Sequence, residues 1–164
     1  MGKNPKIKVP AGKLEILFNV LSVLLILGMI YYAFIMYQQL PEQIPTHFNS
    51  HGEPDDWGSK ASIFMLPVIA IFIFVPMYFL SRVPHVFNYL VTITEENAPR
   101  IYPISRLMMA TFNFSMVSLF AFLEWETVQA IDGNAVTGPW FVFIVIFYPL
   151  ILLGFFAVWM WKKA

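Results

Sequence analysis

The sequence predicts an all-α membrane protein: a four-transmembrane-helix bundle with both the N and the C terminus in the cytoplasm. Hydrophobic residues make up 59% of the 164 residues and charged residues only 12%. Soluble domains are about half apolar and a quarter charged, and disordered chains are more polar still. Four long apolar stretches predict four membrane spans, and the one-sided distribution of basic residues predicts their orientation. We expect a single membrane domain over residues 1–164.

Each apolar stretch is long enough to cross a bilayer, whose hydrocarbon core requires about 20 helical residues. The spans are expected at about 15–38, 62–82, 104–126 and 139–161. Segments of this length without period-two alternation favour helices over strands. An outer loop then covers 39–61 and an inner loop covers 83–103.

The orientation follows from the basic residues that flank the spans, because cytoplasmic flanks are enriched in Lys and Arg. Only Lys60 lies on the side of the first loop. The nine other basic residues lie on the opposite side, which places both termini in the cytoplasm: Lys3, Lys6, Lys8, Lys13, Arg82, Arg100, Arg106, Lys162 and Lys163. Arg100 and Arg106 are expected to meet anionic lipid headgroups there.

Several classes of function are excluded or disfavoured by composition. The chain has no cysteine, which excludes disulfides, thiolate metal sites and thiol nucleophiles. Its net charge is zero, so there is no basic footprint for nucleic acid. None of the short motifs of hydrolases or metalloproteases occurs. We therefore expect a protein that is not an enzyme and that needs no cofactor.

Polar residues inside the spans are expected to join helices. Thr111, Ser115 and Ser118 are spaced i, i+4, i+7, so they share one face of the third span, suited to helix–helix contact. Asn19 and Asn113 are expected to hydrogen-bond between helices.

The outer loop concentrates groups that bind ligands. His47, Asn49 and Asp55 lie close together, followed by Trp57 and Lys60. Imidazole and carboxylate suit a metal such as zinc or manganese, but a loop that hydrogen-bonds to itself is the favoured alternative, and no metal site is assigned. Glu124 falls at the membrane boundary, where an acid calls for a partner. Lys60 is expected beside Glu124 or Glu126, and His47 is the other candidate.

The same loop carries a resemblance to a known family. The pattern is formed by Ile44, Pro45, His47, Phe48, Asn49, Gly52, Asp55, Trp57, Gly58 and Lys60. It resembles the signature of DUF1648, a bacterial membrane-protein family described as a domain of unknown function. That domain also forms the N-terminal part of SdpI-type immunity proteins, and this chain is similar to the short, four-span members. The resemblance implies a location in the bacterial cytoplasmic membrane.

The inner loop holds a second cluster of polar residues. Thr94, Glu95, Glu96 and Asn97 look like the start of a helix, with a hydroxyl cap followed by acids. A clamp in which Glu95 or Glu96 pairs with Arg100 or Arg106 is slightly favoured. The alternative is a site for a cytoplasmic partner. Strings similar to this one occur in short members of the family.

These features predict an immunity or sensing protein whose outer loop recognises an external peptide or ion and couples to the inner loop. The alternative is an accessory subunit of a membrane transporter or signalling complex, and an intramembrane enzyme is ranked last. Expected partners are the lipid bilayer, the external peptide or ion, and a membrane protein or a second copy of the chain.

Overall fold

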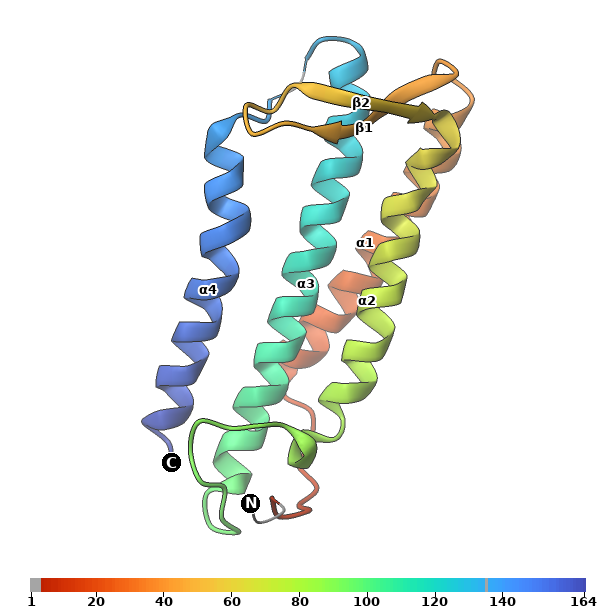
Figure 1. Ribbon diagram of the computed structural model, residues 1–164. Coiled ribbons are helices and arrows are strands. Elements are labelled where there is room, and N and C mark those ends of the chain that lie inside the picture. Colours follow the sequence, from red (N-terminus) through yellow and green to blue (C-terminus); the bar gives the residue numbers. More distant parts are fainter. Residues whose placement is uncertain (1–3, 135) are drawn as a thin grey trace.

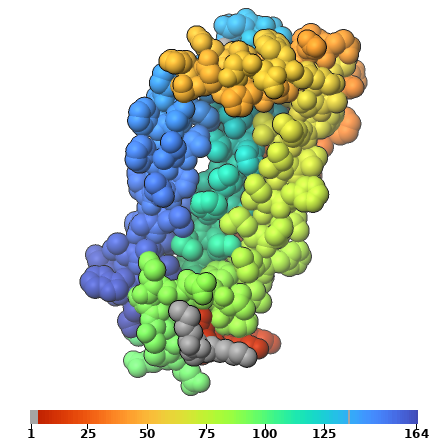
Figure 2. Space-filling view, viewed as in Figure 1, coloured from red at the N-terminus to blue at the C-terminus, as the bar shows by residue number. Residues whose placement is uncertain are grey.

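A computed structural model describes residues 4–134 and 136–164, so Lys3 of the basic flank lies outside the described residues. Its long helices are α1 (Lys13–Tyr37), α2 (Met65–Ser81), α3 (Ala98–Ile131) and α4 (Pro139–Trp161). Helix α3 contacts the three other long helices, and α4 lies beside α3 (Figure 1). The space-filling view shows α4 standing apart from α3 over part of its length (Figure 2).

The two ends of the bundle differ in construction. Strands β1 (Gln43–Phe48) and β2 (Pro54–Ser59) form an antiparallel hairpin that crosses one end, followed by a short 3₁₀ helix, η1 (Lys60–Phe64). The first described residues, the C-terminus and the 3₁₀ turn η2 (Pro84–Val86) lie at the opposite end (Figure 1). We call these the hairpin end and the terminal end.

The predicted fold class is confirmed: the structure is mostly helical, and four of its helices are long and apolar enough to cross a membrane. Their outward faces carry large apolar side chains, as lipid-facing surfaces require. Within each helix the backbone groups hydrogen-bond to one another, so none needs a partner in the lipid. Helix α4 is the extreme case, since Phe156 is its one buried residue among those described. The chain is a multi-pass membrane protein.

Small residues set how closely the first three helices approach. Ala33 and Ala70 are fully buried, and Ala70 packs in one cluster with Ile26, Phe74 and Val117 from three different helices. Lipid offers no hydrophobic drive for helix association, so such close packing is a main source of stability in membranes. The packing holds α1, α2 and α3 as a unit to which the hairpin and α4 are attached.

The hairpin and the length of α3 depart from the expected elements. Residues 39–61 were expected as a loop without strands, but Ile44 pairs with Gly58 and Pro45 with Trp57, with irregular register on either side of His47. Pro45 fits because such irregularities tolerate a missing N–H donor. Helix α3 runs from Ala98 to Ile131 rather than from 104 to 126, because its polar ends are satisfied by other parts of the chain.

Candidate functional site

Two positions of the motif, Ile44 and Gly52, fix the hairpin to the rest of the molecule. Ile44 lies in a cluster with Ala33, Leu40 and Ile63, which fixes the hairpin on α1 and η1. Gly52 has a φ of +81°, and a Cβ there would overlap the carbonyl of Thr137. Only glycine combines that conformation with such a close approach. The hairpin tip is thereby seated on the segment that leads into α4.

Asn49 shapes the hairpin turn. Its Oδ1 accepts hydrogen bonds from the backbone N–H of His51 at 2.8 Å and of Glu53 at 3.1 Å. Its Nδ2 donates to the Glu53 carboxylate at 3.2 Å. An Asn side chain that bonds to the backbone after it is a turn-forming device. Asn49 therefore supports the hairpin. This agrees with the alternative in which the loop hydrogen-bonds to itself.

The exposed surface of the hairpin carries the groups that remain free to meet a ligand. The Nδ1 of His47 lies 2.5 Å from the Oδ1 of Asp55, and both side chains are exposed. Trp57 is 51% exposed on the second strand. An imidazole–carboxylate pair beside an indole can bind polar and aromatic groups of a peptide. Within residues 4–134 and 136–164, no group of three or more His, Asp or Glu side chains is arranged to hold a metal.

Lys60 does not lie beside Glu124 or Glu126, so the expected pairing is wrong. Its Nζ lies 2.9 Å from the Oε1 of Glu42, and it also sits over the Tyr37 ring at 5.2 Å. The cause is the strand pairing: Gln43 opposes Ser59, which brings Glu42 to Lys60. The alternative partner, His47, is paired with Asp55 instead.

Glu124 and Glu126 lie at the hairpin end of α3, where both are buried. The Oε1 of Glu126 accepts from the N–H groups of Val136 and Thr137 and from the Thr137 hydroxyl, so it anchors the segment before α4. The Oε1 of Glu124 is buried and has no hydrogen-bond partner within the part of the chain that the structure describes. The Oε2 of Glu126 also lacks a partner, so the two acids differ in one respect: Glu126 anchors a segment through its other oxygen, and the structure records no such bond for Glu124.

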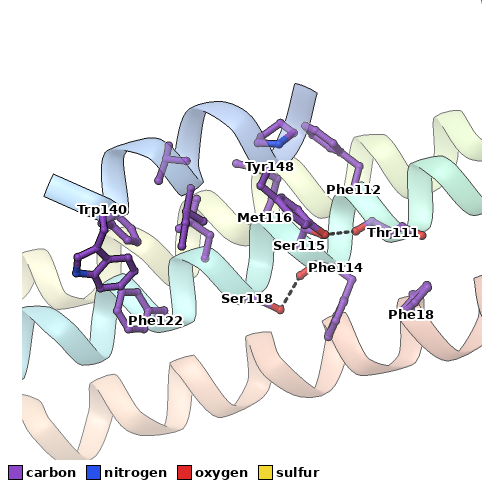
Figure 3. A pocket seen from close by; sticks show the side chains of 15 residues that line it. Phe18, Thr111, Phe112, Phe114, Ser115, Met116, Ser118, Phe122, Trp140 and Tyr148 are labelled. Carbon is purple, nitrogen blue, oxygen red and sulfur yellow. Dashed lines mark hydrogen bonds between the residues drawn. The ribbon is translucent and has the colours of Figure 1, made fainter. Parts of the chain in front are cut away.

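Thr111, Ser115 and Ser118 line an apolar groove of about 490 Å³ between α3 and α4 (Figure 3). Each hydroxyl donates to the carbonyl four residues earlier, at 2.8–2.9 Å. Ser115 also lies 2.7 Å from the Tyr148 hydroxyl of α4. The face is thus a helix contact at Ser115, and its remainder borders open space.

Asn113 and Asn19 behave differently from each other. Asn113 donates across to the carbonyl of Phe74 in α2 at 3.2 Å, which is the expected bond between helices. Asn19 donates to the carbonyl of Glu15 in its own helix at 2.9 Å, so the interhelical bond expected for it does not form.

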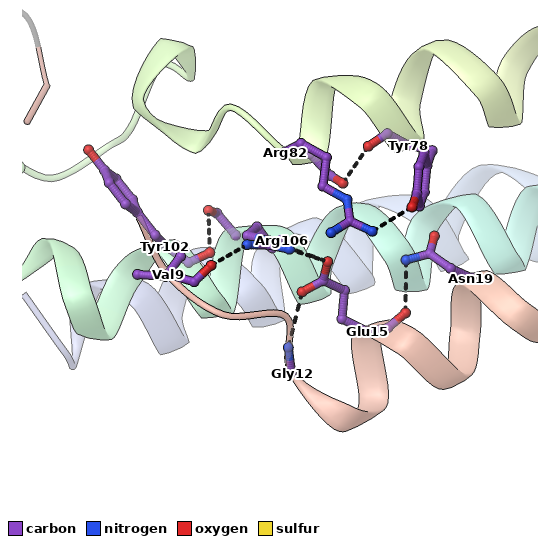
Figure 4. Close-up of polar contacts among 10 residues, drawn as sticks. Val9, Gly12, Glu15, Asn19, Tyr78, Arg82, Tyr102 and Arg106 are labelled. Atoms are coloured by element: carbon purple, nitrogen blue, oxygen red, sulfur yellow. Dashed lines mark hydrogen bonds and ion pairs between the residues drawn. The ribbon is translucent and has the colours of Figure 1, made fainter. Parts of the chain in front are cut away.

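The terminal end contains a buried ion pair that the sequence analysis missed. The Arg106 guanidinium lies 2.8 Å from the Oε1 of Glu15, and both side chains are buried (Figure 4). Arg106 also donates to the carbonyl of Val9 at 2.7 Å. Arg106 therefore does not reach lipid headgroups, contrary to expectation. The sequence did contain a signal for this pair: Glu15 and Arg106 lie near the ends of two spans on the same predicted side of the membrane.

The pair fixes the N-terminal strap, which we define as residues 4–12. The Tyr102 hydroxyl donates to the carbonyl of Pro5 at 2.6 Å, and Asn4 donates to the carbonyls of His85 and Phe87. Tyr89, in the loop beside them, bonds to Pro84 and Ser105, and burial raises its pKa to about 12. It remains a neutral hydrogen-bonding group at physiological pH.

The segment 94–97 forms a turn just before α3. The N–H of Thr94 donates to Asn97 Oδ1 at 2.9 Å, and the N–H of Asn97 donates to Thr94 Oγ1 at 3.2 Å. The helix itself begins at Ala98, so residues 94–97 precede it rather than form its first turn. Glu95, Glu96 and Arg100 are exposed. The expected clamp is absent among the described residues, because Arg106 is held by Glu15 and Arg100 points to the surroundings.

Comparison with known proteins identifies the part of the chain that contains the hairpin. Residues 24–71 match the family described as Domain of unknown function (DUF1648). This part of the chain is similar to a DUF1648 domain. The matched residues comprise the second half of α1, the hairpin and the beginning of α2. Glu124, Arg106 and α4 lie outside the matched residues.

An uncharacterized protein from Archaeoglobus fulgidus (strain ATCC 49558 / DSM 4304 / JCM 9628 / NBRC 100126 / VC-16) is 35% identical over 69 residues. The match covers 42% of this chain and 36% of the relative, so the chain spans about a third of the length of that protein. No solved structure matches the chain. The DUF1648 domain therefore defines a relationship without supplying an activity.

Proposed function

We propose that this DUF1648 protein is a bacterial cytoplasmic-membrane factor of the immunity or sensing type, and that it acts without catalysing a reaction. Its hairpin faces the outside and recognises a peptide or an ion, and its terminal end faces the cytoplasm. The basic residues support this orientation, since nine of the ten lie on the terminal side.

The observation that carries the proposal is that one helix contacts both ends of the molecule. Helix α3 is unbroken over 34 residues, or about 50 Å at the rise of an α-helix. At the hairpin end, its Glu126 holds the segment on which Gly52 rests. At the terminal end, its Arg106 holds the strap. A ligand that moves the hairpin would thus shift a rigid element that also bears on the cytoplasmic loop.

The exposed hairpin groups are the proposed recognition surface. The His47–Asp55 pair and Trp57 are exposed, and the buried Ile44 and Pro45 of β1 fix the hairpin that carries them. Rigid presentation of exposed polar and aromatic groups lowers the entropy that binding must overcome. On the cytoplasmic side, the exposed Glu95, Glu96 and Arg100 next to the Thr94–Asn97 turn are the proposed output surface.

The test is a protection assay in a sensitive Gram-positive host. Cells that express the wild type or His47→Ala at equal membrane levels are challenged with secreted membrane-active peptides. Protection by the wild type that is lost in His47→Ala supports the proposal. His51→Ala is the matched control, because this imidazole lies on the same hairpin and takes no part in the pair. No protection by the wild type would contradict an immunity role against those peptides.

A second candidate function is that of an accessory subunit in a transporter or signalling complex, or of one copy in a homo-oligomer. The observation that favours it is the large apolar surface of α4, with the α3–α4 groove beside it. Purification in a mild detergent tests it: a stoichiometric partner that is lost in Ser118→Leu, but kept in Phe155→Leu, supports this function. Ser118 borders the groove, whereas Phe155 faces away from the bundle.

A further inference from the structure

Glu124 stands out because it is buried without a partner. It is 1% exposed, and its Oε1 makes no hydrogen bond within residues 4–134 and 136–164. In the same part of the chain, no Lys, Arg or His lies within ion-pair distance of it. A buried carboxyl without a hydrogen bond costs free energy, so an acid retained in this position calls for a function.

The carboxyl lies between two hollows. On one side, a groove of about 490 Å³ runs along α1 and α3, lined by Gly28, Tyr32, Phe114, Glu124 and Trp125. On the other side, a smaller pocket of about 120 Å³ lies beneath the hairpin and includes Thr46, Ser62 and Glu124. Glu124 is the only charged residue in either lining as the structure describes it.

The groove has the composition of a site for an organic cation. Aromatic faces attract cations through their quadrupole, and this attraction is larger where water is excluded. Tyr32, Phe114 and Trp125 supply aromatic rings, and Glu124 supplies a carboxyl group that can serve as a counter-ion once a cation is bound. The rest of the lining is aliphatic, and the volume falls in the range of small-molecule sites.

The groove is open toward the lipid. Leu24, Gly28 and Trp125 are exposed on the outer surface of α1 and α3. At Gly28, a Cβ would meet nothing within 4 Å, so the missing side chain leaves free space. A ligand with an apolar body reaches such a groove from the bilayer, where it is already concentrated.

We propose that the α1–α3 groove binds an amphipathic organic cation, with Glu124 as its counter-ion and Tyr32, Phe114 and Trp125 around its apolar body. The inference goes beyond the proposed function, because it adds a second site at Glu124 to the exposed His47–Asp55 surface. Free lipophilic cations and lipids with an ammonium headgroup share this chemistry.

The probe is tetraphenylphosphonium, and the measurement is equilibrium binding to the purified full chain in detergent. We expect saturable binding by the wild type. Removing the charge in Glu124→Gln is expected to weaken it by about tenfold or more, as the loss of a desolvated cation partner would. Glu95→Gln, which alters an exposed acid, is the matched control and should bind like the wild type.

A second variant keeps the carboxyl and fills the groove. Gly28→Leu is expected to weaken binding by a similar factor, because its side chain occupies the free space without displacing the protein. Gly154→Leu in α4 is its control, since a Cβ there also meets nothing within 4 Å and the site is remote from Glu124. This pair keeps the proposal testable if Glu124→Gln fails to fold.

Two further arms complete the test. Triphenylphosphine oxide, which is uncharged, should bind much more weakly than the cation.

Titration with phosphatidylethanolamine, compared with titration with phosphatidylglycerol, distinguishes a lipid source. Selective displacement of the probe by phosphatidylethanolamine assigns the site to an ammonium headgroup, and no displacement assigns it to a free cation. Equal binding of the uncharged probe, or wild-type affinity in Glu124→Gln, would overturn the proposal. Binding with no protection in cells would contradict the immunity role alone.

Discussion

At the scale of single residues, the charged groups that are buried in the bundle determine how the chain is held together. Glu15 and Arg106 neutralise each other at the terminal end, and Arg106 also satisfies the Val9 carbonyl. The Oε1 of Glu126 accepts from backbone N–H groups and its Oε2 has no partner, whereas no hydrogen bond to the Glu124 carboxyl forms within the described residues. Each acid therefore has a different role, although all three lie at helix ends near a membrane surface.

Breaking the Glu15–Arg106 pair is expected to destabilise the fold strongly. Arg106→Met leaves the Glu15 carboxylate buried without a counter-ion, which typically costs about 3–5 kcal/mol. The double variant Glu15→Gln/Arg106→Met should recover much of that loss, because neither charge remains. Unfolding in mixed detergent micelles measures both. If the double variant were as unstable as Arg106→Met, the loss of the Val9 contact would be the cause instead.

Gly52 is expected to be less tolerant of substitution than Gly133, although both have positive φ. Gly52→Ala combines a left-handed conformation, worth about 1–2 kcal/mol, with a collision against Thr137. Gly133→Ala carries the conformational cost alone, since nothing lies near its Cβ. Thermal unfolding midpoints should therefore fall further for Gly52→Ala. Equal decreases would show that the hairpin does not press on the segment before α4.

At the scale of elements, α4 is attached differently from the first three helices. Those helices share buried clusters, whereas α4 contributes Phe156 as its single buried residue and leaves a groove beside α3. Its contacts include the Ser115–Tyr148 hydroxyl pair, the Phe122–Phe141 rings and the segment that Glu126 holds, and Met160 packs on the cluster that contains Tyr102. This loose attachment makes α4 the element most suited to move or to meet another protein.

Neighbouring phenylalanines in α4 allow this packing to be tested. Phe156 is 3% exposed and Phe155 is 59% exposed. In lipid the transfer term is small, so Phe156→Ala should cost mainly the cavity term, about 2 kcal/mol. Phe155→Ala should be close to neutral. The free energy of unfolding in detergent checks both. Equal effects would contradict the claim that α4 contacts the bundle through the face that carries Phe156.

At the scale of the whole molecule, the two ends carry different chemistry. The hairpin end has the exposed His47–Asp55 pair and the buried acids, and the terminal end gathers the strap, the η2 turn and the C-terminus. A helix that reaches both ends joins them. Orientation in the membrane therefore decides which end meets an external ligand.

Cysteine labelling tests that orientation directly, because the chain contains no cysteine of its own. Trp57→Cys is expected to react with a membrane-impermeant maleimide on intact cells. Lys162→Cys should react only after the cells are permeabilised, as the basic flanks predict. Both positions are exposed, so access to the thiol is not limiting. The reverse pattern would place the hairpin in the cytoplasm and contradict the proposed function.

The sequence determined the features that depend on composition and local pattern. The membrane class, the number of long helices and the position of the informative loop all follow from apolar runs and turn residues, as does the fourth helix at residues 139–161. It also singled out Glu124, since an acid next to an apolar stretch stands out without any structure.

Only the tertiary structure decided which groups meet, because partners far apart in sequence leave no local trace. Strand pairing brought Lys60 to Glu42 rather than to Glu124. The strap and α1 brought Glu15 to Arg106, which removed Arg106 from Glu95 and Glu96. Helix α3 extends past residues 104 and 126, the expected limits of the span, since Arg106 and Glu126 find partners inside the protein. The carboxyl of Glu124 has no such partner among the described residues.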